Sequence, residues 1–147
     1  MLRKLIFYTE AADAVIVRTF LQTKQPMPQA EALFSHVLNA QHIWISRINK
    51  FDAKFNRFDI HPVSMFHDLH QENIRTLKKI LEEEDLNRTV DYATFSGDKF
   101  ENSVQDILLH VVNHSTYHRA QIATLFKQNN VKPLETDFIT YQRAGSL

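Results

Sequence analysis

The chain has 147 residues, 44% hydrophobic and 23% charged, a composition typical of one soluble domain (residues 1–147) that can bury a core. Its 17 Lys and Arg residues balance 17 Asp and Glu residues, so the net charge gives no indication of a nucleic-acid partner. There is no cysteine, which excludes disulfides and thiolate ligands, and any metal site must use His, Asp or Glu.

Hydrophobic residues recur at helical spacing over residues 2–22, which predicts a first helix. Glu10 and Asp13 lie where a signal peptide would need its apolar core, so we expect no signal peptide. No hydrophobic run approaches the roughly 20 residues of a membrane span. The sequence therefore predicts a cytoplasmic protein without membrane contact.

A second helix is predicted over residues 28–51, and Pro28 can open it because the first position of a helix needs no amide donor. Residues 52–63 read as a linker. Ser64 is the predicted N-cap of a third helix, which runs to about Glu84.

Residues 89–100 roughly alternate polar and bulky side chains around a turn at 96–98, a pattern typical of a small β-hairpin. A fourth helix is predicted over residues 103–128. Ser103 and Asp106 are spaced as in a capping box at its start.

The tail runs from Leu134 to Leu147, and part of it is expected to dock on the helices through Phe138, Ile139 and Tyr141. The four predicted helices have roughly 20 residues and an apolar stripe each. They predict an all-α fold, a four-helix bundle with a small β-hairpin between the third and fourth helices.

Three histidines lie at or near the edges of these apolar stripes. Because a helix turns by about 100° per residue, His118 falls within the apolar face of the fourth helix and His114 falls at its edge. The two are four residues apart, a spacing that can bracket one metal ion. His36 lies at the edge of the apolar face of the second helix. From spacing alone, both a three-histidine metal site and ordinary buried histidines remain possible.

The other histidines are placed less favourably for this site. His110 points further toward solvent or a neighbouring helix, and His42 lies on the opposite side of the second helix, where we expect a surface or an interface. His70 falls within the stripe of the third helix. It either lines the same cavity or is an ordinary buried histidine.

Three neighbours of the predicted ligands are candidates for supporting roles. Gln121 faces the same way as His114, so we expect it to contact a ligand or the substrate, with Tyr117 beside it. Arg119 points away from His118 and is expected to be structural. The HExxH motif of zinc proteases is absent, since no glutamate follows His110 or His114.

The segment DILLHVVNHSTYHRAQI, residues 106–122, resembles the signature of the DinB family, which comprises damage-inducible, YfiT-like metalloproteins. Residues 92–100, 33–44 and 136–139 are similar to the hairpin, the second-helix motif and the C-terminal segment of that family. The resemblance implies a four-helix bundle that binds one divalent ion, zinc or nickel, through His36, His114 and His118. Ala120 stands where many members have glycine.

Two classes of function follow. In the first, the open coordination positions of a three-histidine site serve a metal-dependent hydrolase, or an S-transferase that uses a low-molecular-weight thiol as some relatives do, acting on an unknown small molecule. In the second, the ion only stabilises a non-catalytic interaction module of a stress or damage response. Helix faces such as that of His42 and Trp44 would then form a homodimer.

Overall fold

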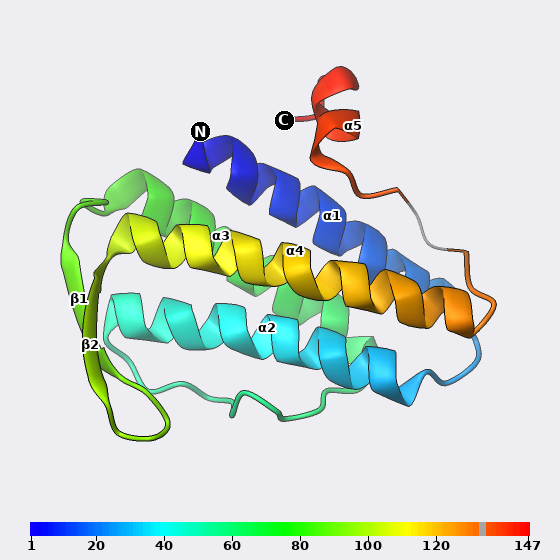
Figure 1. The fold of residues 1–147 in the computed structure, drawn as a ribbon, viewed down its shortest axis with the longest axis horizontal. Helices are drawn as coiled ribbons and strands as arrows, with labels where there is room; N and C mark the ends of the chain where they lie inside the picture. Colours follow the sequence, from blue (N-terminus) through cyan, green and yellow to red (C-terminus); the bar gives the residue numbers. More distant parts are fainter. Residues whose placement is uncertain (133–134) are drawn as a thin grey trace.

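The computed structural model describes residues 1–132 and 135–147. Four long helices lie side by side, and a two-stranded hairpin covers one end of them (Figure 1). They are α1 (Leu2–Gln22), α2 (Pro28–Asn49), α3 (Phe66–Glu83) and α4 (Val104–Gln128). The predicted four-helix bundle with a hairpin between its third and fourth helices is confirmed. None of the helices formed by the described residues is long and apolar enough to cross a membrane.

The helix boundaries follow the predictions to within two residues. Helix α2 ends two residues early because Lys50 adopts a left-handed conformation, with φ of 57°. The prediction of Ser64 as an N-cap is wrong. Ser64 lies inside a 3₁₀ turn, η1 (Val63–Met65), that leads directly into α3, and no side chain caps that helix. An N-cap needs an extended backbone, which Pro62 adopts instead.

Strand β1 (Thr89–Ala93) pairs antiparallel with β2 (Lys99–Ser103). Gly97 has a φ of 89° in the turn between them, a conformation that glycine adopts without steric cost. Ser103 caps α4, since its hydroxyl accepts a hydrogen bond from the Asp106 amide at 3.2 Å and donates one to the Asp106 carboxylate at 2.6 Å. The predicted capping pair is confirmed.

The core consists of two apolar clusters separated by a polar layer. The cluster nearest the hairpin includes Ile48, Leu77 and Leu108, and the cluster at the other end includes Phe34 and Phe66. Between them along the helices lie buried polar side chains, which we call the polar layer: Asp13, Gln41, Asn73, Ser115 and Arg119. Because the layer takes members from all four helices, it fixes their relative positions at mid-height.

The C-terminal segment docks on α1 through a short helix, α5 (Phe138–Arg143) (Figure 1). The Tyr8 ring contacts those of Phe138 and Tyr141 at 5.4 and 5.8 Å. Ile139 remains 52% exposed. Leu134, where the predicted tail begins, lies outside the described residues.

Candidate metal centre

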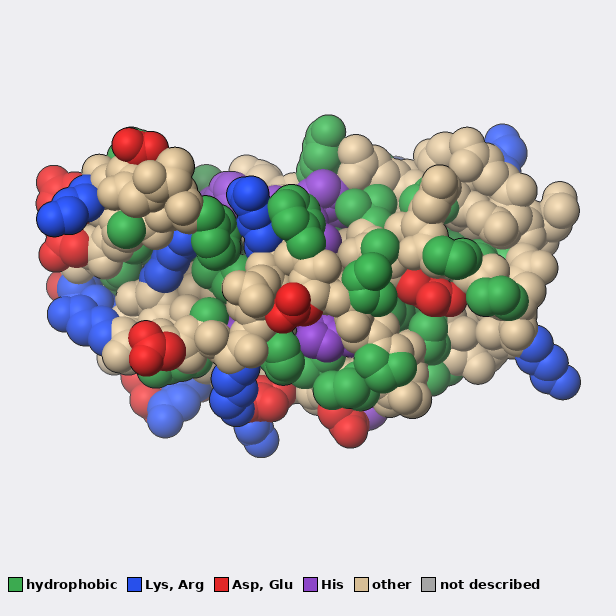
Figure 2. Space-filling view, turned by 90° about the horizontal axis from the view of Figure 1, so that it is seen from below, with side chains coloured by type: hydrophobic (Ala, Val, Ile, Leu, Met, Phe, Trp, Pro, Cys, Tyr) green, Lys and Arg blue, Asp and Glu red, His purple; other side chains and the backbone are tan. Residues whose placement is uncertain are grey.

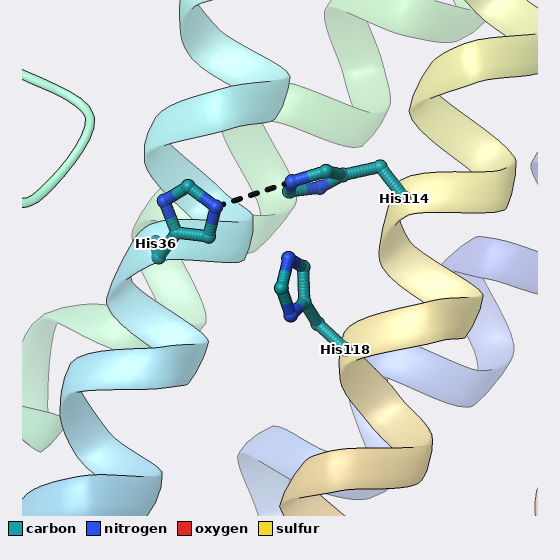
Figure 3. A group of neighbouring side chains, drawn as sticks. All are labelled: His36, His114 and His118. Carbon is teal, nitrogen blue, oxygen red and sulfur yellow. Dashed lines mark hydrogen bonds between the residues drawn. The ribbon is translucent and has the colours of Figure 1, made fainter.

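The structure brings His36, His114 and His118 together from two neighbouring helices (Figure 3). His36 projects from α2, and His114 and His118 project from successive turns of α4. The Nε2 atoms of His36 and His114 are 3.2 Å apart, and one ring nitrogen from each of the three residues lies within 4.8 Å of the others. Among the described residues, no other group of three His, Asp or Glu side chains brings its ligand atoms as close.

Two of these imidazoles are oriented by hydrogen bonds on their far side. His36 Nδ1 lies 2.8 Å from the backbone oxygen of Arg57, and His118 Nδ1 lies 2.7 Å from Oε1 of Gln121. Because an amide oxygen only accepts, each Nδ1 carries the proton and donates it. The Nε2 lone pair of each ring is thus left free for a metal ion.

The donor set fits a divalent ion. Two imidazoles on a tetrahedral zinc ion at about 2.0 Å would have their nitrogens roughly 3.3 Å apart, close to the 3.2 Å between His36 and His114. Three neutral nitrogen ligands suit zinc, nickel, copper or iron. They also leave at least one coordination position without a protein ligand, as in catalytic rather than structural zinc sites.

The environment of His114 and His118 favours the neutral form of the imidazole, which is the form that binds metals. Burial lowers the pKa of His114 to about 3, and the neighbouring charges of His118, His36 and His110 act in the same direction. Burial also lowers the pKa of His118, against the opposite effect of its hydrogen bond to Gln121. Protons therefore compete little for His114 and His118 at neutral pH.

The loop between α2 and η1, residues 50–62, forms one wall of the centre. It runs along α2 (Figure 1), and we call it the α2–α3 loop. Asn39 donates to the Asp59 oxygen at 2.7 Å and also bonds His61 Nε2 at 2.6 Å. These bonds bring the Arg57 carbonyl and the Phe58 ring against His36.

His42, expected at a surface or an interface, is partly covered by its own chain. The side chain is half-buried, its ring contacts those of Phe51 and Phe55, and its Nε2 accepts from the Lys54 amide at 3.0 Å. Trp44 likewise contacts its own chain. The homodimer based on these residues stays a prediction.

His36 and His114 also line an open pocket of about 340 Å³. Its other walls carry Arg47 and Trp44 from α2, Arg57 from the α2–α3 loop and residues 94–96 from the hairpin turn. Histidine, cationic and hydrophobic side chains gather on this face of the molecule (Figure 2). Sequence reasoning did not identify the two arginines. Arg57 reaches the site on a loop, and Arg47, although it lies on α2, belongs to no motif that the sequence pattern singled out.

The polar layer lies directly behind the centre. Arg119 forms an ion pair with Asp13 at 2.6 Å, with both side chains almost fully buried. Gln41 donates to Asp13 at 2.9 Å and lies 3.1 Å from the hydroxyl of Ser115. The expected structural role of Arg119 agrees with this buried ion pair. Its partner Asp13 was missed, since a lone carboxylate in α1 carries no sequence signal.

The remaining candidates divide into neighbours of the centre and residues apart from it. Tyr117 is 64% exposed and its ring contacts His118 at 5.0 Å. The His110 ring contacts Trp44 at 5.1 Å and His114 at 5.8 Å. His70 is buried against α1, beside Ala14 and Val17, and does not line the pocket of His36 and His114.

Comparison with known proteins gives a family match and a match to a curated relative. A family model described as "DinB family" matches residues 19–145. The chain is 33% identical over 60 residues to "Protein DinB" of Bacillus subtilis (strain 168), a match that covers 41% of this chain and 35% of that protein. The match thus spans about a third of the length of this curated relative. No solved structure matches the chain.

Proposed function

The chain belongs to the DinB family, and on that premise we propose that it binds one divalent metal ion through His36, His114 and His118 and uses it in a reaction on a small molecule. The observation that carries the proposal is the convergence of three imidazoles. Two of them, His36 and His114, line an open pocket, and His36 and His118 are held in the ligand tautomer. Zinc and nickel are the ions we expect, and the reaction is a hydrolysis or the transfer of a low-molecular-weight thiol.

The chain's own residues orient the imidazoles that would hold the ion. A bound divalent ion would supply a Lewis acid next to the pocket. Arg57 and Gln121 hold the imidazoles of His36 and His118 by their Nδ1 protons, and the polar layer fixes α4 behind them. Because the chain has no cysteine, a thiol taking part in the reaction must come from a cofactor.

The enzymatic proposal is tested by a turnover screen. Zinc- and nickel-loaded protein is incubated with low-molecular-weight thiols and epoxide or halide electrophiles, and separately with ester and amide substrates. We expect one combination to turn over in a metal-dependent way, and His114→Ala to lose that activity. Equal rates with and without the protein throughout the screen would contradict an enzymatic role.

The alternative is a metal-stabilised module without catalysis. It draws support from the position of the ligands, since an ion held by α2 and α4 would join two helices directly. In that case metal removal by a chelator lowers the melting temperature while the turnover screen stays negative. A metal-dependent turnover would decide against this alternative.

A further inference from the structure

Two arginines face the pocket beside the metal centre without an acidic partner. Arg47 and Arg57 both line it, and no carboxylate does. Across residues 1–132 and 135–147, neither guanidinium has a carboxylate oxygen within 4.0 Å. Two uncompensated positive charges at one small pocket repel each other, and an anion placed between them would be attracted by both.

Most hydrogen-bond donors of these arginines are unused within the described chain. A guanidinium has five N–H groups. One from Arg47 donates to the Ala93 oxygen at 3.2 Å, and none from the Arg57 side chain donates to a described residue. Burial lowers the pKa of Arg47 from its ordinary value, which reflects the free-energy cost of keeping this charge partly out of water.

Aromatic rings hold the two guanidinium groups in place. Arg47 lies over Trp44 at 4.3 Å and over Phe95 at 6.0 Å, and Arg57 lies over the same Phe95 ring at 4.8 Å. These cation–π contacts use no N–H donor in a hydrogen bond, so the N–H groups stay available for an oxyanion. Phe95, which lines the pocket, is 59% exposed, and Phe58, stacked on His36, is 67% exposed, so the site offers apolar surface as well as charge.

We propose that this pocket binds an organic oxyanion, a carboxylate or a phosphate that carries an apolar group. Arg47 and Arg57 pair with the anionic group, and Trp44 and Phe95 contact the apolar part. The volume of about 340 Å³ suits a small molecule. The role of this anion as the substrate rests on the proposed metal-dependent function, whereas its binding to the arginines does not.

The pocket contains its own reporter, because Trp44 is the single tryptophan of the chain. The metal-free protein is titrated with benzoate, with phenyl phosphate and with neutral benzamide at low ionic strength, and tryptophan fluorescence is recorded. We expect saturable binding of at least one anion, with benzamide at least about tenfold weaker, because hydrogen bonds to charged groups are the stronger ones. The ratio of benzoate to phenyl phosphate affinity identifies the preferred oxyanion.

Matched variants separate the pocket from general charge effects. Arg57→Gln and Arg47→Gln should each weaken binding of the preferred anion at least about tenfold. Arg75→Gln removes the same charge from an exposed position on α3 and should leave the affinity unchanged. Equal affinity for benzoate and benzamide, or equal losses in all three variants, would overturn the proposal.

A zinc-loaded arm distinguishes this proposal from that of the metal site. Anion binding in the metal-free protein that is lost in Arg57→Gln supports the arginine site whether or not zinc binds. Anion binding that needs zinc and is indifferent to both arginine substitutions would show a metal ligand only, and would overturn it. Failure of the protein to bind zinc at all would contradict the proposed function alone.

Discussion

The geometry of single side chains decides whether the centre can bind a metal ion. His36 and His118 each donate an Nδ1 proton to an oxygen of the chain, so each presents Nε2 to the same point. Without such a partner an imidazole rotates and changes tautomer, and part of its affinity for a metal is lost. Gln121 is therefore more than a neighbour of the ligands, since it sets the direction of one of them.

Gln121→Leu should weaken metal binding without unfolding the protein. The substitution keeps the size of an exposed side chain but removes the acceptor at 2.7 Å from His118 Nδ1. Loss of such a partner lowers metal affinity by about 10- to 100-fold. Gln128→Leu, exposed on the same helix, is the control. Zinc affinity is measured by competition with a chelator, and equal affinities of Gln121→Leu and the parent would refute the role of Gln121.

Periodicity could find the histidines but not their surroundings. His36, His114 and His118 lie within or at the edges of helical stripes, so their directions follow from the sequence of each helix alone. Arg57 and Asp13 reach the same region from other segments, and no local pattern relates them to the ligands. At Ser64 the local pattern predicted a helix cap that does not form, because this residue lies inside the 3₁₀ turn that begins after Pro62.

Among the elements, the α2–α3 loop has the largest influence on the centre. It has no regular structure, yet Asn39 fixes it at Asp59 and His61. The amphipathic helices were predictable because burial of one face repeats every turn. The path of this loop was not, because it depends on hydrogen bonds between residues about twenty positions apart in the chain.

Asn39→Leu should loosen the loop and weaken the metal site together. The buried amide holds Asp59 and His61, and its loss leaves their polar atoms unpaired at a cost of about 1–3 kcal/mol. Hydrogen–deuterium exchange should rise over residues 52–60 and stay unchanged in α3, and zinc affinity should fall. Asn49→Leu, exposed at the end of α2, is the matched control. Unchanged exchange over residues 52–60 would contradict the role of Asn39.

At the scale of the whole molecule, the polar layer holds the four helices in register behind the centre. It divides the apolar core in two and contains the buried Asp13–Arg119 pair. Such a pair adds little net stability compared with apolar packing, but removal of one partner leaves an unpaired charge in the core. The layer therefore makes the position of α4, and of the two histidines on it, depend on α1.

A double-mutant cycle tests this dependence. Asp13→Asn and Arg119→Met should each lower the free energy of unfolding by about 3–5 kcal/mol, and the double variant should lose less than the sum. The exposed Arg3–Glu82 pair, at 3.5 Å, is the control and should show a coupling of about 1 kcal/mol or less. Urea denaturation provides the measurement. Additive losses at Asp13 and Arg119 would contradict the coupling.

The metal-free protein should be sensitive to acid. Burial lowers the pKa of six of the eight histidines below the ordinary 6.5, and that of His114 to about 3. At a pH between the lowered pKa of a histidine and 6.5, the unfolded chain binds more protons than the folded chain. The free energy of unfolding should thus fall with falling pH, by up to about 1.4 kcal/mol per unit for each histidine, and gain nothing further above pH 6.5.

His70→Leu should reduce this sensitivity. Burial lowers the pKa of His70, although the charges of Asp13 and Glu10 and the nearby Glu10 backbone act in the opposite direction. Neither ring nitrogen of His70 has a hydrogen-bond partner among the described residues. Unfolding in urea with EDTA at pH 7 and pH 5 should show a smaller difference for this variant than for the parent. His67→Leu, exposed on the same helix, should behave as the parent. Equal pH dependence of the His70 variant and the parent would be evidence against the buried neutral state.

The most direct test of the three-histidine centre is the metal content of untagged protein after zinc or nickel loading and gel filtration. We predict about one ion per chain for the parent and for His67→Ala, and loss of that ion in His36→Ala, His114→Ala and His118→Ala. Circular dichroism of each variant shows whether it is folded. A folded His114→Ala protein that retains one ion per chain with the affinity of the parent would contradict the assignment of the centre.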